Sequence, residues 1–285
     1  MKRSLQLMGN GVILFLAVSC NATESNIVDC VGIRPGMSVT EARERLASYV
    51  PDLEVQAFEL RIPSLGDNSL LERLFVVRMP AFPSNDPIET LLAAITLPPN
   101  KPVVWKVVHS FRFEDEHEHT KIALFAALRM KYGKESLTLE EPSGKISLFW
   151  VLGADGIPVH GTVAEKCSKF FQHSYQFPLA GESAALRAGE STELMNSLRT
   201  DAYLSGIESA HPMPQDPQHC QSTYIVAELS VDSNTELVNR MLIAVIDVPL
   251  DLRATEATRA VIREAETANT KQEIYNASER QTPRL

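Results

Sequence analysis

Four strand patterns follow one another between residues 58 and 113 with only turns between them, and this order constrains the fold most. In the first, Phe58, Leu60 and Ile62 alternate with charged residues, which is typical of a strand with one buried face. The next three strands are predicted at residues 70–79, 90–97 and 103–113. Because consecutive strands joined by short turns usually pair with their neighbours, the pattern predicts an antiparallel sheet.

Helix patterns occur before and after these strands. Ser38 and Glu41 form a capping box, in which the hydroxyl and the carboxylate each satisfy a free backbone N–H group, and Pro51 ends the helix that follows. Further helices are predicted at residues 118–132, 182–205 and 252–268, and further strands at 147–152, 222–231 and 236–248. Since the chain shows no regular strand–helix–strand alternation, we expect an α+β fold with antiparallel sheet and helices packed on one face.

The first residues of the chain have the order of a secretory signal peptide. Lys2 and Arg3 supply a positive start, residues 11–18 (GVILFLAV) are an apolar core, and small residues precede Cys20. The apolar run is far shorter than the roughly 20 residues that span a membrane. We therefore expect residues 1–19 to be a signal peptide and the body of the chain to be soluble outside the cytoplasm.

The cleavage region also resembles a bacterial lipobox. The sequence Ala17-Val18-Ser19-Cys20 implies that Cys20 becomes the lipidated first residue, with residues 20–27 as a short tether to a membrane on the periplasmic side. More than one acyl chain makes such an anchor stable. The same residues fit an ordinary cleavage after Ser19, which would give a secreted, unlipidated protein.

The remaining cysteines fit an exported chain. A disulfide between Cys167 and Cys220 is predicted, because the segment between them is rich in Gly, Pro and polar residues and needs a crosslink to be ordered. Cys30, between Ile27 and Ile33, is interpreted as a small buried apolar residue. Its pairing with another cysteine is the alternative.

The charge of the chain argues against nucleic-acid partners. It has 285 residues, with 27 basic and 36 acidic side chains and a net charge of −9. Removal of residues 1–19 leaves 25 basic and 36 acidic residues, a net charge of −11. An acidic protein repels phosphate backbones, so no nucleic-acid binding is expected.

Two clusters contain residue types that bind metals. Residues 114–119 (EDEHEH) place His117 and His119 on the same side of an extended chain, with Glu114 or Glu116 as further ligands. The segment precedes a helix, where acids are favoured by the helix dipole, so a solvated helix start is the preferred interpretation. The second cluster, His211, Asp216, His219 and Cys220, is interpreted as a Pro-rich loop closed by the disulfide.

Motifs of catalysis are missing from the sequence. It contains no nucleophile elbow, Walker A loop, dinucleotide-binding glycine pattern or C-x-x-C pair. His109, on a strand face shared with Trp105, Phe111 and Phe113, is interpreted as a hydrogen-bonded core residue. We therefore expect a non-enzymatic protein without a cofactor.

The first helix also carries a resemblance to a known family. Gly36-Met37-Ser38 followed by a helix resembles the small outer-membrane-assembly lipoproteins of the SmpA/OmlA type, which implies a protein-binding scaffold with a helix and antiparallel sheet. Residues 128–136 (LRMKYGKES) show a helix that again closes before a strand, which suggests two related helix-plus-sheet units. The expected organisation is residues 28–153 and 154–275 as the two units, the second holding the disulfide-closed loop, and 276–285 as a disordered tail.

These observations predict an exported bacterial envelope lipoprotein that acts as a scaffold or binds an envelope protein. Strand addition to an exposed sheet edge is one way for such a protein to bind. Two rival hypotheses remain open: a metal-assisted periplasmic hydrolase using His117 and His119, and a secreted, unlipidated effector.

Overall fold

A computed structural model gives the fold of the chain. The residues that it describes are 28–60, 70–78, 88–113, 118–153, 155–174, 220, 222–232 and 234–280. The expected signal peptide, the tether with Cys20 and the helix expected at residues 182–205 lie outside these ranges. So do the candidate ligands Glu114, Glu116, His117, His211, Asp216 and His219.

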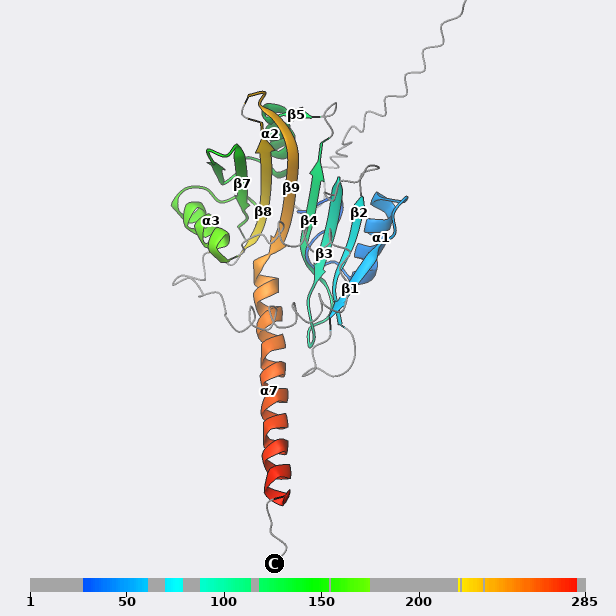
Figure 1. Ribbon diagram of the computed structural model, residues 1–285. Coiled ribbons are helices and arrows are strands. Elements are labelled where there is room, and N and C mark those ends of the chain that lie inside the picture. Colours follow the sequence, from blue (N-terminus) through cyan, green and yellow to red (C-terminus); the bar gives the residue numbers. More distant parts are fainter. Residues whose placement is uncertain are drawn as a thin grey trace, which may run out of the picture.

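One antiparallel sheet organises the molecule (Figure 1). Its nine described strands are β1 (Gln56–Leu60), β2 (Leu70–Arg78), β3 (Glu89–Ile95), β4 (Val104–Arg112), β5 (His119–Thr120), β6 (Leu137–Glu140), β7 (Lys145–Val151), β8 (Thr223–Val231) and β9 (Leu237–Asp247). The order across the sheet is β1-β2-β3-β4-β9-β8-β7-β6, and β5 pairs with β9 beside this path. The described helices are α1 (Val39–Tyr49), α2 (Lys121–Tyr132), α3 (Thr162–Ser174) and α7 (Val248–Arg280). The predicted α+β class is confirmed.

Helices α1 and α2 pack on the same face of the sheet. The capping box of Ser38 and Glu41 starts α1, and the Thr120 hydroxyl accepts from the Ala123 N–H to start α2. Gly133 ends α2 at a φ of 78°, a backbone angle that residues other than glycine rarely adopt. Both helices bury an apolar side against one continuous core of strand residues. Burial of this side accounts for most of their stability, since helices of 11 and 12 residues are marginal alone.

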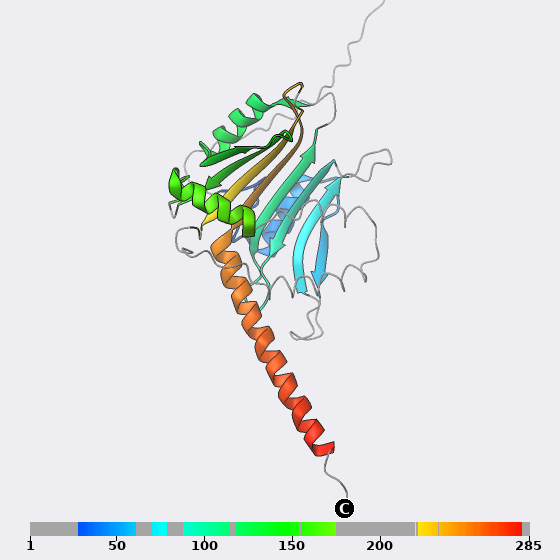
Figure 2. The same ribbon diagram turned by 60° about the vertical axis from the view of Figure 1, so that its left-hand side comes forward.

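The opposite face of the sheet carries α3 (Figure 2), so the helices cover both faces and not one face as expected from the sequence. Ala164 and Cys167 of α3 pack there on Phe149 and Val151, in a second core that also contains Cys220. Neither α3 nor the short strand β6 was predicted from the sequence. Helix α3 was missed because its amphipathic pattern runs into the segment between Cys167 and Cys220, whose Gly, Pro and polar residues were interpreted as a loop.

The chain contains two units of the same order, one helix followed by four antiparallel strands. The first is α1 with β1–β4, the second is α2 with β6–β9, and the last strand of each, β4 and β9, pair at the centre of the sheet. The residue that caps each helix also pairs with the start of its unit's last strand, Ser38 with Val103 and Thr120 with Leu237. This order supports the suggestion of two related units.

A shared irregularity strengthens the correspondence. Ala94 pairs with Lys106 and Ile95 with Val104, which leaves Trp105 as an extra residue in β4. In the second unit Ser230 pairs with Arg240 and Val231 with Val238, which leaves Asn239 as the extra residue in β9. In each unit the extra residue directly follows the first paired residue of the last strand, which is Val104 in β4 and Val238 in β9. Since bulges are preserved features of a fold rather than accidents, the two units are equivalent residue by residue along these strands.

The observed boundary between the units differs from the expected one. The first unit ends with β4 near residue 113 and the second begins near residue 118, so the expected division after residue 153 falls within the second unit. Strand β7 follows α2 and β6 in the chain, so a division after residue 153 separates it from β8 and β9. Only its pairing with β8 assigns it to the second unit. Residues 276–280, expected in the disordered tail, belong to α7.

Helix α7 leaves the sheet and projects away from it (Figure 1). Its first turns pack on the body: Ala254, Thr258 and Ile262 are buried, and the Thr258 hydroxyl donates to the Pro98 carbonyl at 2.7 Å. All residues from 266 to 278 are exposed. No helix among the described residues is both long and apolar enough to cross a membrane.

Candidate functional site

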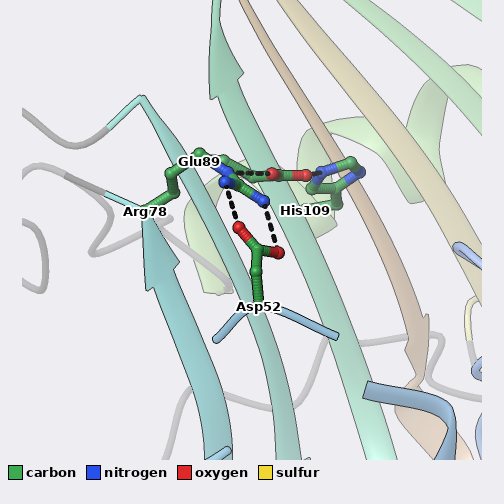
Figure 3. Close-up of polar contacts among 4 residues, drawn as sticks. All are labelled: Asp52, Arg78, Glu89 and His109. Carbon is green, nitrogen blue, oxygen red and sulfur yellow. Dashed lines mark hydrogen bonds and ion pairs between the residues drawn. The ribbon is translucent and has the colours of Figure 1, made fainter. Parts of the chain in front are cut away.

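Four charged or titratable side chains form a connected row on the face of the sheet that α1 covers (Figure 3). Asp52 follows the end of α1, Arg78 ends β2, Glu89 begins β3 and His109 lies in the middle of β4. We call these four residues the ionic chain. Arg78 and Glu89 occupy the face that holds Leu74, Val76 and Leu91 because strand residues two apart share a face. The ionic chain therefore joins the turn after α1 to the central strands.

The contacts in the ionic chain link each residue to the next. The Arg78 guanidinium donates through Nη1 to Asp52 Oδ2 at 2.7 Å and through Nη2 to Asp52 Oδ1 at 3.2 Å. Its Nε donates to Glu89 Oε2 at 3.4 Å, and the other carboxylate oxygen of Glu89 lies 2.8 Å from His109 Nε2. Arg78 is thus held between two carboxylates, and Glu89 has both oxygens engaged.

Burial changes steadily along the ionic chain. The exposed fraction of the side chain is 7% for His109, 18% for Glu89, 36% for Arg78 and 59% for Asp52. Hydrogen bonding to His109 first, and then to Arg78, lowers the pKa of Glu89 despite its burial. The hydrogen bond from Arg78 is likewise the main cause of the lowered pKa of Asp52. Both carboxylates are therefore held in the ionised form.

Aromatic rings surround the buried end. Tyr49 lies edge-on to His109 with ring centroids 5.7 Å apart, and its pKa is raised to about 12 by burial first and then by the Glu89 charge. Beyond His109 the row continues through Phe111 and Phe113 to His119, with neighbouring centroids 4.7 to 5.1 Å apart. This packing fixes the imidazole between the end of α1 and the start of α2.

The second unit shows what the fold needs at this place. Counting from the two bulges, His109 corresponds to Ile243, Glu89 to Ile225 and Arg78 to Trp150. Trp150 pairs with Ile225 as Arg78 pairs with Glu89, and Ile243 and His109 each lie two residues before the strand partner of Ile225 or Glu89. All three are buried, Trp150 fully. An apolar core therefore fills the position that the first unit fills with ions.

The equivalent polar link in the second unit is a single neutral hydrogen bond. Trp150 Nε1 donates to the Gly133 carbonyl at the end of α2 at 2.9 Å, where Arg78 binds Asp52 beyond the end of α1. A buried ionic group costs desolvation, and apolar packing of similar volume is often as stable or more stable. The charges of the ionic chain are thus not required by the fold, which makes it the strongest functional candidate among the described residues.

The structure bears directly on two of the predicted cysteine roles. Cys167 and Cys220 form the predicted disulfide, with Cα atoms 5.0 Å apart, and both are buried. Cys30 is a free, buried thiol, as interpreted from the sequence, and burial raises its pKa to about 12. The thiol is thus held in its neutral form. The predicted lipidation residue, Cys20, lies outside the described residues.

The predicted histidine clusters are described only in part. His119 is exposed and lies edge-on to Phe113, whereas His117 and its neighbouring carboxylates are outside the described residues. Within the part of the chain that the structure describes, no group of three or more His, Cys, Asp or Glu side chains could hold a metal ion. The metal hypothesis for His117 and His119 stays a prediction.

His109 was correctly interpreted as a hydrogen-bonded core residue, but its partners were missed. The available signal was a charge at an inward position of an apolar strand. Glu89 precedes Leu91 by two residues and Arg78 follows Val76 by two, so each falls on the buried face.

No protein-family model, curated protein or solved structure matches the chain.

Proposed function

We propose that the chain is an exported envelope lipoprotein, anchored through Cys20, that binds a partner protein through the projecting part of α7. It acts as a scaffold and carries out no reaction itself. The lipobox-like start of the sequence supports the anchor. The disulfide between Cys167 and Cys220 supports export, because such bonds form and persist in oxidising compartments outside the cytoplasm.

The exposure of α7 is the observation that carries the binding proposal. Residues 266–278 are exposed on every side of the helix, so no described part of the chain packs against them. A helix of that length gains little stability from its backbone alone and is marginal without a surface to pack on. At a rise of about 1.5 Å per residue, this part extends roughly 20 Å from the body.

The projecting part also presents apolar side chains. Ile274 is 66% exposed and Tyr275 is 57% exposed, next to each other near the end of α7. Tyrosine is enriched among the residues that dominate binding energy at protein interfaces, because it buries a large ring and keeps a polar tip. A partner groove that receives one side of the helix would cover these residues.

The proposal assigns no catalytic residue. The polar groups of the ionic chain are engaged with one another, and its histidine is buried. No observation on the described residues favours the metal-assisted hydrolase over the scaffold. The secreted, unlipidated form differs from the proposal only at Cys20.

Site-specific photocrosslinking in intact envelopes tests the proposal. A photoreactive amino acid at Ile274 or Tyr275 is expected to capture one defined protein. Deletion of residues 266–285 is expected to abolish binding of that protein. The matched control is Met130 on α2, an apolar residue on the body that is 72% exposed and so at least as accessible as Ile274 and Tyr275. Capture of the same proteins from both places, or of none from α7, would contradict binding through α7.

A further inference from the structure

The ionic chain is placed where it can control one helix. It starts at Asp52, three residues after the end of α1, and ends on β4 at the centre of the sheet (Figure 3). Through Arg78, Asp52 attaches this end of α1 to β2 and β3, and Tyr49, the last residue of α1, faces Glu89 beside it. Movement of the turn after α1 away from the sheet would break the contact between Asp52 and Arg78.

The apolar attachment of α1 is light. Its buried helical side chains are Ala42 and Leu46, with Val50 at its end. At the equivalent places α2 buries Leu124, Leu128 and Tyr132, of which the first and the last are larger than their counterparts. The start of α1 has separate backbone anchors, since the Gly36 N–H donates to the Val104 carbonyl at 2.7 Å and Ser38 pairs with Val103. The end of α1 therefore depends on the ionic chain more than its start does.

We infer that the ionic chain is an acid-released latch that holds the C-terminal end of α1 on the sheet. The latch is closed while Glu89 and Asp52 are ionised and opens when they are protonated. The second unit has no such latch, since Trp150, Ile225 and Ile243 stand in its place and carry no titratable group. Acid therefore releases this attachment of α1, which has no counterpart at the same position of the second unit.

The sign of the pH effect follows from the two carboxylates. The groups that face Glu89 from the elements packed around it are Tyr49 from α1, Asp52 from the turn after it, Arg78 from β2 and His109 from β4. Protonation of Glu89 removes the acceptor shared by Arg78 and the imidazole. Because the pKa values of Glu89 and Asp52 are lowered in the closed state, the closed state is favoured at neutral pH and loses this advantage as the pH falls below their ordinary values of 4.5 and 3.8.

Opening would uncover an apolar surface at one place. Val50, Leu74 and Leu91 are buried in the core on the α1 face, and Tyr49 packs on His109. Release of the end of α1 exposes part of this surface while β4, β9 and the second unit keep their pairing. The device is independent of α7 and of any partner that α7 binds.

Hydrogen–deuterium exchange of the full chain at pH 7 and pH 3.5, corrected for the intrinsic pH dependence of exchange, tests the latch. One pH unit below the ordinary pKa of Glu89, the equilibrium constant for opening of α1 is expected to rise by up to about tenfold. Peptides from α2 are the internal reference. The experiment uses a Glu135→Gln background, because the Glu135 carboxylate, whose pKa Arg129 of α2 lowers to about 2, would itself lose its stabilising contribution to the end of α2 as the pH falls below 4.5. A parallel loss of protection in α1 and α2, or no change in α1, would overturn the inference.

Two variants separate the latch from a general effect of acid. Asp52→Asn changes an exposed side chain without touching the core, and it is expected to raise α1 exchange at pH 7 and to reduce the further increase at pH 3.5. Replacement of Arg78, Glu89 and His109 by Leu, Ile and Ile copies the apolar chemistry of the second unit and is expected to make α1 exchange independent of pH. Wild-type behaviour of Asp52→Asn at both pH values would rule out the latch, even where the triple variant fails to fold.

Discussion

Removal of the Cys167–Cys220 disulfide should cost this fold much of its stability. The bridge closes a loop with a sequence separation of 53 residues, between α3 and the start of β8. In the chain-entropy account, opening a loop of this length stabilises the unfolded state by about 4 kcal/mol. Both cysteines are buried in the core on the α3 face, so the double variant Cys167→Ala/Cys220→Ala also loses packing.

Urea unfolding measures this loss directly. The wild-type chain with a reductant is expected to unfold with a free energy lower by about 4 kcal/mol, and the double variant should lose more because it also loses buried side-chain volume. For a chain of this size the melting temperature should fall by about 8 to 16 °C. Cys30→Ala is the matched control, because it removes an equally buried thiol outside the loop and should leave the response to reductant unchanged. A free energy of unfolding that does not respond to reductant would refute the entropic reasoning.

Three further predictions concern other parts of the fold. Glu135→Gln should lower the free energy of unfolding by about 2 to 3 kcal/mol at pH 7, because the buried carboxylate accepts a hydrogen bond from Arg129 and has its pKa lowered from 4.5 to about 2. In urea titrations the difference from wild type should vanish as the pH falls from 4.5 towards 2. Equal stability of the two proteins at pH 7 would contradict this prediction. Gly144→Ala should destabilise the β6–β7 hairpin by about 1 to 3 kcal/mol in thermal unfolding, because φ is +83° and a Cβ atom would clash with the Val231 carbonyl oxygen. Trp150→Phe should cost about 1 to 3 kcal/mol in urea unfolding, because it leaves a cavity at a fully buried side chain and removes the donor to the Gly133 carbonyl at the end of α2. A cost near zero would argue that the smaller ring and the lost hydrogen bond are both compensated.

Local patterns in the sequence predicted most elements with a strong periodic or capping signal. The capping box at Ser38 and the stop at Pro51 gave α1 nearly residue by residue, and the hairpin of β8 and β9 was found from its turn. The pairing of β4 with β9 was not predicted, because the two strands are separated by more than a hundred residues and no local pattern encodes their contact. The division of the chain into units was misplaced for the same reason.

The length of α7 shows another limit. Its apolar pattern stops near Ala268, where the predicted helix ended, but the helix continues to Arg280. Lys, Gln, Glu and Ala in this part are good helix formers, so the helix persists where burial no longer does. Periodicity detects a helix that packs on something and misses one that projects.

The ionic chain could be predicted only in part. His109 was recognised by its aromatic neighbours on the same strand. Its partner Glu89 lies twenty residues earlier, and Arg78 and Asp52 lie on two further elements. Their contacts depend on strand register, which a single charged residue at the end of an apolar run does not specify.

The central claim is that this chain is an exported, lipid-anchored protein with one disulfide, and the intact mass of protein taken from membranes tests it most directly. The account predicts a chain that starts at an acylated Cys20 and whose mass rises by two hydrogens on reduction. Before reduction, the chain should have a single free thiol, that of Cys30. A chain that retains residues 1–19, or an unmodified Cys20 with no mass change on reduction, would contradict the account.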